Sequence, residues 1–231
     1  MITLVYREKC LNTANLHLKG HRVSKISPLT PSIISITECY EPERVRVERF
    51  IKNVYEQSYF ADICVEYPLL MSVCNADGDI LAAVGFRYAA EEPLFLEQYT
   101  NSSIETVLNC KRGEIAEIGN LASAGKGASI FLFAALASYL DQRGIKYAAV
   151  TGTNVLYRYF EKIGLQPRII CDATPAALKH HNSHWGSYYD AQPCVMAGSI
   201  KRGVKRINSI LGARFEDCRP RLFPRLYYKL D

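Results

Sequence analysis

Residues 114–164 constrain the fold of this 231-residue chain more than any other part of it. Residues 114–119 have the alternation of side chains between two faces that is typical of a strand. The glycine-bearing residues 120–129 follow, and they lead into an apolar helical stretch over 130–140. Residues 147–152 lack alternation, which is typical of a strand buried on both faces, and residues 154–163 form a helix ended by Gly164. This order predicts a parallel α/β unit with a right-handed crossover.

Further elements flank this unit. Residues 69–75 and 80–86 surround an Asp-Gly turn and predict a β-hairpin. Strands are also expected at 33–38, 168–171 and 194–200, a short extended run at 94–99, and helices at 41–60 and 103–108. We therefore expect one α/β domain over residues 32–200, with a mixed central sheet flanked by helices. Residues 1–31 would form an N-terminal arm and residues 201–231 a C-terminal extension.

The positive charge is concentrated in that extension. The chain has a formal charge of +5, and residues 201–231 hold nine basic residues against three acidic ones, so the body is close to neutral. Apolar residues fall at helical spacing among these charges, at Ile200, Val204, Ile207 and Leu211. Such a basic amphipathic helix packs on the body with a solvated face, lies on an anionic membrane, or grips an acidic carrier protein. No nucleic-acid-binding module accompanies it, and no nucleic acid partner is expected.

The cysteines and the N-terminus bear on location and metals. Eight cysteines are scattered singly, which favours reduced thiols. Neither a secretory signal nor a membrane span is visible, and a cytoplasmic protein is the expectation. His180, His181 and His184 share a loop, but only Asp190 and Cys194 follow at ligand spacing, so no metal is expected.

Two motifs resemble those of the GNAT acyltransferase superfamily. Residues 124–129, Ala-Gly-Lys-Gly-Ala-Ser, resemble its pyrophosphate loop, although Ala124 and Ser129 depart from the pattern. Residues 154–165 resemble the helix that lies beside the pantetheine arm in that superfamily. Phe160 stands there in place of a tyrosine that often protonates the departing thiolate, which puts ordinary amine acetylation in doubt.

A closer resemblance covers about residues 50–200. Glu117 to Ser123, Thr151 to Thr153, Asp172 to Pro175 and Trp185 to Tyr189 are similar to segments of the bacterial thermostable hemolysin family. Membership implies a GNAT-like fold related to the acyl-homoserine-lactone synthases. It also implies a haemolytic, virulence-associated name derived from phenotype. Arg87 and Glu117 fall near a strand arginine and a glutamate motif of those synthases, although Asn120 replaces the arginine of that motif.

The glycine loop is the candidate carrier site. Backbone amides at the start of an apolar helix bind anions, and glycines allow a pyrophosphate to approach closely. The alternative is a loop that only joins a strand to a helix. The predicted residues for binding acyl-CoA or a phosphopantetheine thioester are Leu121, Ala122, Gly125, Lys126, Gly127, Ala128, Ser129 and Asn154.

Glu117 and Arg87 are the candidate catalytic residues. Glu117 lies near the point where its strand would separate from the parallel neighbour, and burial there would raise its pKa toward neutrality and make it a base. A salt-bridged strand carboxylate is the alternative. Arg87 pairs with Glu117, holds an acceptor carboxylate, or forms a salt bridge with Glu91 or Glu92.

Trp185 and Tyr188 are candidates for the acceptor pocket, or else plugs over the end of the sheet. Three functions are consistent with these residues. The first is an acyltransferase or acyl-synthase-like enzyme that uses acyl-CoA or acyl carrier protein as donor. The second is a haemolytic, membrane-active virulence factor without acyl transfer, and the third is a GNAT-like protein that binds acyl-CoA without turnover.

Overall fold

The computed structural model describes residues 1–178 and 183–219, and a single ten-stranded sheet runs through them. The strand order is β10-β2-β1-β3-β4-β5-β6-β7-β9-β8. Neighbours are antiparallel except for the parallel pairs β1–β3 and β6–β7. The strands are β1 (Ile2–Glu8), β2 (Leu11–Leu18), β3 (Ile33–Thr37), β4 (Leu69–Cys74), β5 (Ile80–Tyr88), β6 (Ile115–Ser123), β7 (Tyr147–Gly152), β8 (Arg168–Asp172), β9 (Cys194–Ser199) and β10 (Arg214–Asp217).

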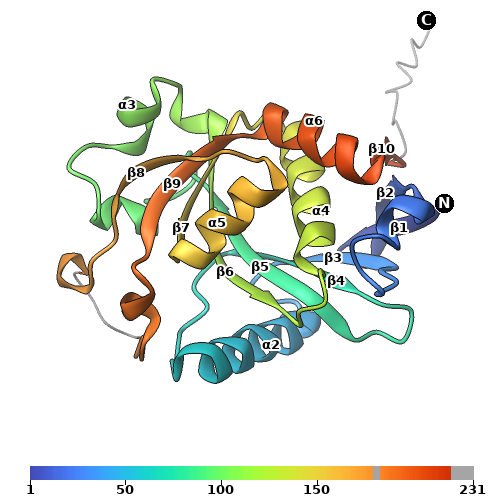
Figure 1. Ribbon diagram of the computed structural model, residues 1–231, viewed down its shortest axis with the longest axis horizontal. Coiled ribbons are helices and arrows are strands. Elements are labelled where there is room, and N and C mark those ends of the chain that lie inside the picture. Colours follow the sequence, from blue (N-terminus) through green and yellow to red (C-terminus); the bar gives the residue numbers. More distant parts are fainter. Residues whose placement is uncertain (179–182, 220–231) are drawn as a thin grey trace, which may run out of the picture.

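Helices cover both faces of the sheet (Figure 1). One face is covered by α2 (Pro42–Tyr59), which packs on β4, β5 and β6, and by the segment between β5 and β6. That segment contains the 3-10 helix η1 (Phe95–Gln98), α3 (Ile104–Leu108) and the 3-10 helix η2 (Arg112–Glu114). On the other face lie α4 (Ser129–Gln142), α5 (Asn154–Ile163) and α6 (Ile200–Leu211), with the short α1 (Gly20–Val23) against α6.

Local sequence accounts for most of the element boundaries. Pro42 occupies the start of α2, where its missing N–H costs nothing, and Gly164 ends α5 with a φ of +79°. Gly78 adopts a φ of +91° in the turn between β4 and β5. The predicted hairpin, the helix after the first body strand and the β6-α4-β7-α5 unit are therefore confirmed.

Two local predictions were wrong. Residues 94–99, expected to be extended, contain the 3-10 helix η1 (Phe95–Gln98), and the Glu97 and Glu117 carboxylates accept the amide N–H groups that a strand would have offered to a neighbour. Residues 120–123, expected in the loop, continue β6, since β5 pairs with them as far as Ser123.

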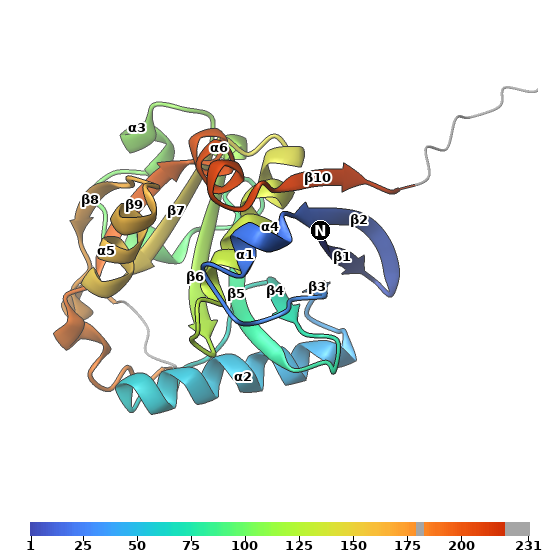
Figure 2. The same cartoon turned by 45° about the vertical axis from the view of Figure 1, so that its right-hand side comes forward.

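The two ends of the described chain join the same sheet (Figure 2). Residues 1–31, expected as an arm, supply β1 and β2, and β1 runs parallel to β3. Residues 200–217, part of the expected extension, supply α6 and β10, which pairs with β2. The apolar stripe of α6 is buried against α4 through Ile200, Ile207 and Leu211, while its lysines and arginines face solvent.

Among residues 1–178 and 183–219, no helix has both the length and the apolar character that crossing a bilayer requires.

Candidate functional site

The sheet opens between β6 and β7. Only Ile115–Ile118 of β6 pair with β7, through Tyr147–Val150, so Gly119–Ser123 and Thr151–Gly152 have no partner across this boundary. The two parallel strands thus separate at their carboxyl ends. Ligands of open α/β sheets bind at such positions, because unpaired backbone groups and side chains of both strands converge there.

A β-bulge at Asn120 lies where this opening begins. Between the pairs Gly85–Gly119 and Ala83–Ala122, β6 advances by one residue more than β5. Asn120 takes the extra position with a φ of +49° and is largely buried. Because a bulge shifts the alternation by one residue, Gly119 and Asn120 both face the pocket on the α2 side of the sheet.

That pocket, here called the polar pocket, lies on the α2 side of the opening. Its wall combines tyrosines with charged and amide side chains, and β5, β6 and β7 contribute to its floor. The residues that line it are Tyr55, Cys64, Glu66, Tyr67, Arg87, Phe95, Tyr99, Gly119, Asn120, Thr151, Ser183, Trp185 and Tyr188. The Thr151 hydroxyl is buried and has no hydrogen-bond partner within the described part of the chain.

Two glycines make room for Tyr67 over the sheet. A Cβ atom added to Gly119 would lie 2.0 Å from the Tyr67 hydroxyl, and one added to Gly85 would lie 2.6 Å from its ring. The Arg87 guanidinium carbon lies 4.5 Å from the centre of the same ring. Tyr67 is therefore held between a glycine floor and a cation, a favourable arrangement for an aromatic ring.

Arg87 and Glu117 are adjacent, as predicted for paired groups. Arg87 Nε lies 3.4 Å from Glu117 Oε2, and its Nη1 lies at the same distance from Glu92 Oε2. The guanidinium also donates to the carbonyl oxygens of Pro93 and Glu66, at 3.4 and 3.3 Å. All these contacts are longer than the roughly 2.8 Å of a strong charge-assisted hydrogen bond.

Glu117 is fully buried at the inner end of the opening. Its two oxygens accept hydrogen bonds from the backbone N–H groups of Phe95 and Leu96, at 2.9 and 2.8 Å. Burial raises the pKa of this carboxyl to about 7, against the opposing effects of Arg87 and the two amides. The carboxyl does not itself line the polar pocket, but Arg87 and Phe95, which contact it, do.

Trp185 and Tyr188 close the polar pocket on the side of residues 183–191. Their rings lie 5.2 Å apart, and Tyr188 also stacks on Tyr55 of α2 at 6.1 Å. Tyr189 hydrogen-bonds Tyr99 between their hydroxyl groups at 2.7 Å. Both predicted acceptor residues therefore lie in the same pocket as Arg87.

A second pocket, here called the apolar pocket, lies on the opposite face of the opening. It is formed by the α4, α5 and α6 helices over β6, β7 and β9, and almost all of its wall is hydrocarbon. Ile118 and Leu121 of β6 and Val150 of β7 line it, so the opening lies between the two pockets. Phe160 also lines it and packs on Phe133 at 5.2 Å.

The glycine loop follows the end of β6. Gly125, Lys126 and Gly127 have φ values of +81°, +51° and +79°, and Ala128 directly precedes α4, which begins at Ser129. Ser27 of the N-terminal segment donates a hydrogen bond to the Lys126 carbonyl oxygen at 2.6 Å. In this conformation the Lys126 side chain is exposed, and the N–H groups of Ala128 and Ile130 donate to the carbonyl oxygens of Gly125 and Gly127 at 3.0 and 3.3 Å.

Other predicted residues are more dispersed. The Leu121 side chain enters the apolar pocket, whereas Ala122 packs on the α2 side. Asn154 begins α5 and donates to Gln192 at 3.5 Å. His180 and His181 lie outside the described residues. Within residues 1–178 and 183–219, no cluster of three metal-ligating side chains occurs.

The comparisons with known proteins identify the family. A family model described as thermostable hemolysin matches residues 37–204. The chain belongs to the thermostable hemolysin family. No curated protein matches this hemolysin-family chain by sequence.

Solved structures show what this thermostable hemolysin family member resembles in fold. TofI, in a ternary complex with an inhibitor and MTA, is 12% identical, with a TM-score of 0.55 over 76% of this chain and 96% of that one. FeeM, an N-acyl amino acid synthase from uncultured soil microbes, is 18% identical, with a TM-score of 0.52 over 79% and 96%. BjaI, a CoA-dependent acyl-homoserine lactone synthase solved with SAM and isopentyl-CoA, is 10% identical, with a TM-score of 0.52 over 76% and 87%. The predicted GNAT-like fold is confirmed.

Sequence reasoning missed several residues of the polar pocket. Tyr55, Tyr67 and Tyr99 come from three separate segments, and nothing in their local sequence distinguishes them from core tyrosines. The glycines at 85 and 119 were the available signal, because a glycine in a strand interior often marks a close approach by another group.

Proposed function

We propose that this protein transfers an acyl group from a phosphopantetheine thioester, acyl-CoA or acyl carrier protein, to a nucleophile bound in the polar pocket. The observation that carries this proposal is the opening between β6 and β7, with an apolar pocket on one face and a polar pocket on the other. An acyl chain suits the first pocket and a polar acceptor suits the second, so that the thioester carbonyl would lie between the strands.

The glycine loop supports the position of the carrier. Its positive-φ residues precede α4, so the helix N-terminus and Lys126 together favour the phosphates of CoA or of a carrier-bound pantetheine. Unpaired backbone groups of Gly119–Ser123 would then hydrogen-bond the pantetheine amides.

Glu117 supplies the base in this proposal. The acceptor nitrogen or oxygen attacks the thioester carbon, the carbon–sulfur bond breaks, and the acceptor proton passes through water to the Glu117 carboxylate. A pKa of about 7 suits this transfer near neutral pH. The departing thiolate takes its proton from solvent, because Phe160 offers none.

Arg87 supports an acceptor that carries a carboxylate. Its guanidinium lines the polar pocket, and its present contacts are all long, so it can exchange Glu92 for an acceptor carboxylate held in bidentate fashion. Arg87→Lys keeps the charge but loses this geometry, and should raise the KM for the acceptor more than it lowers kcat.

Binding of the carrier is the first experiment. Calorimetry and thermal shift are measured with CoA, acyl-CoAs of several lengths and acyl carrier protein, on the wild type, Lys126→Glu and the control Lys52→Glu. Lys52 is exposed on α2, on the other face of the sheet. We expect Lys126→Glu to weaken binding about tenfold, because a charge-assisted contact is lost, and Lys52→Glu to leave it unchanged. If no carrier binds, or if both variants bind equally, the proposed carrier site is wrong.

A second candidate function is acyl-CoA binding without turnover. Phe160 favours it, since the hydroxyl of the related helix is missing. Release of free thiol from a bound acyl-CoA, tested against a panel of amines and amino acids, separates the two. Binding without thiol release would favour this candidate over acyl transfer.

A further inference from the structure

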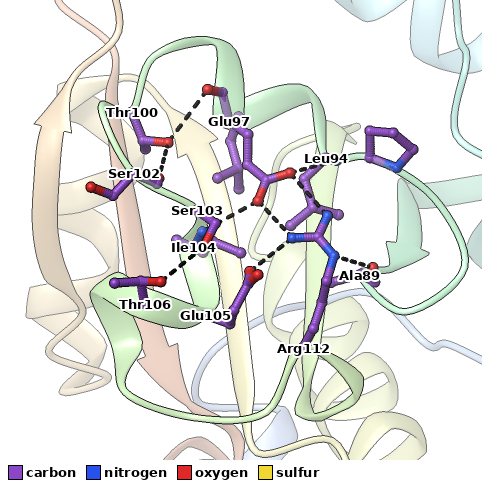
Figure 3. A network of polar contacts seen from close by, with 12 residues as sticks. Ala89, Leu94, Glu97, Thr100, Ser102, Ser103, Ile104, Glu105, Thr106 and Arg112 are labelled. Carbon is purple, nitrogen blue, oxygen red and sulfur yellow. Dashed lines mark hydrogen bonds and ion pairs between the residues drawn. The ribbon is translucent and has the colours of Figure 1, made fainter.

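One arginine joins three parts of the segment that connects β5 to β6. Arg112 forms paired hydrogen bonds with the Glu97 carboxylate, from Nη1 at 2.7 Å and from Nη2 at 2.9 Å (Figure 3). Its Nη1 also donates to Glu105 at 2.8 Å, and its Nε donates to the Ala89 carbonyl oxygen at 2.7 Å. The guanidinium therefore connects the start of the segment, η1 and α3.

The Glu97 carboxylate extends this network into the backbone. Its oxygens accept hydrogen bonds from the N–H groups of Leu94 and Ile104, both at 3.2 Å. The hydrogen bonds and charge of Arg112 hold the pKa of Glu97 below its usual range. The Glu97 carboxylate therefore stays ionised opposite the Arg112 guanidinium. Glu97 thereby fixes the turn into η1 and the start of α3 together.

This turn orients the groups that hold Glu117. The Phe95 and Leu96 amides, which bond the two Glu117 oxygens, are the first two residues of η1, directly after Leu94. Apolar contacts of Leu94, Leu96 and Ile104 bury the segment, but hydrophobic contacts are not directional and do not aim an N–H group. The hydrogen bonds of Arg112 and Glu97 supply that direction.

We propose that Arg112 is a positioning residue: through Glu97 and Glu105 it holds residues 89–112 in the fold that keeps the Phe95 and Leu96 amides on Glu117. Arg112 does not line either pocket, so it acts only through this chain of contacts. The contribution of Arg112 to catalysis rests on the proposed function, in which Glu117 is the base. The positioning itself does not depend on that function.

The test measures the amides and the carboxyl directly. Hydrogen exchange of the Phe95 and Leu96 amides and NMR titration of Glu117 are compared among the wild type, Arg112→Gln, Arg112→Lys and Arg143→Gln. Arg143 is a matched control, since its side chain is 25% exposed against 31% for Arg112, and it pairs with Glu8 at 3.1 Å.

In Arg112→Gln we expect these two amides to exchange about tenfold faster, because the charged hydrogen bonds that order η1 are lost. The pKa of Glu117 should rise further above about 7, because the two amide hydrogen bonds that oppose the effect of burial are weakened. Arg112→Lys should give an intermediate result, since lysine keeps the positive charge but cannot form the paired hydrogen bonds of the guanidinium with Glu97. Arg143→Gln should change neither measurement.

Unchanged amide exchange and an unchanged Glu117 titration in Arg112→Gln would overturn the proposal. So would equal changes in Arg143→Gln, which would indicate general loosening. The apolar contacts of Leu96 and Ile104 are retained in both Arg112 variants, so a folded protein is expected for measurement. Thiol release is assayed separately: a wild type that binds but never releases thiol contradicts the proposed function and leaves the positioning result intact.

Discussion

The two faces of the sheet differ most at the opening between β6 and β7. On the α2 side the opening is lined by tyrosines, Arg87 and Asn120, and buried carboxylate and amide groups support them. On the α4 side it is lined by aliphatic and phenylalanine side chains. One short stretch of β6 supplies both environments, since Gly119 and Asn120 line the polar pocket and Ile118 and Leu121 line the apolar pocket.

The difference indicates a division of labour. Directional polar groups orient a reacting centre, whereas a hydrocarbon wall binds in proportion to the apolar area it covers. The polar side should therefore respond to changes of charge and shape at single atoms, and the apolar side to the length of the bound chain. The following predictions test this contrast.

The largest expected effect is on the polar side, at Glu117. The pKa of about 7 in the folded state exceeds the ordinary 4.5, so the protonated carboxyl stabilises the fold below pH 4.5, and this contribution is lost as the pH rises through 7. Relative to Glu117→Gln, the wild type should lose up to about 3 kcal/mol of unfolding free energy across this range. Denaturant unfolding at several pH values measures it, and parallel profiles would contradict the buried, uncharged state.

A smaller effect is expected at the glycine floor. Gly119→Ala places a methyl group against the Tyr67 ring and hydroxyl, and should destabilise the protein by about 1–3 kcal/mol through overpacking. Gly198→Ala is the matched control, because a Cβ there meets only Pro167 at 4.0 Å, an ordinary contact. Thermal unfolding compares the two, and equal destabilisation would mean that the close approach of Tyr67 is not the cause.

The apolar side should respond to chain length. Each methylene buried there adds about 0.8 kcal/mol to binding, until the pocket is filled. Ala137→Phe, which fills part of the pocket, should abolish this increment while leaving the affinity for CoA itself unchanged. Calorimetry across an acyl-CoA series measures both. An increment that survives the substitution would indicate that the chain binds elsewhere.

The smallest effect on stability is expected on the basic face of α6. Replacing Lys201, Arg202 and Lys205 by glutamate should change the unfolding free energy by less than about 0.5 kcal/mol, because the side chains are exposed. The same variant separates the partners considered for this helix. Weaker binding of acyl carrier protein would favour a docking role, and loss of binding to anionic vesicles would favour the membrane-active alternative.

Deleting residues 201–231 is a poor test of that alternative, since α6 buries Ile207 and Leu211 in the core and β10 pairs with β2. The concentration of basic residues at 201–231 had led us to expect a C-terminal extension outside the domain. The described part of them, through residue 219, instead completes the sheet and covers α4. Net charge along a chain describes its solvated side chains and does not indicate where the apolar residues between them pack.

Local pattern predicted several features of the site well. The strand that carries Glu117, its separation from β7 and the glycine loop all follow from period, turn chemistry and strand order. The surroundings of Glu117 were less accessible. Its hydrogen-bond donors lie 21 and 22 residues earlier in the sequence, in a segment expected to be extended.

The sequence by itself determined the β6-α4-β7-α5 unit, the hairpin before it and the helical period of α6, because each depends on residues within a turn or two of one another. The tertiary structure alone decided that Tyr67 lies over Gly85 and Gly119, and that Arg112 ties Ala89 to Glu97. These contacts depend on how distant segments fit around a shared core. Backbone propensity carries no information about that fit, whereas packing and the need to satisfy buried polar groups select it.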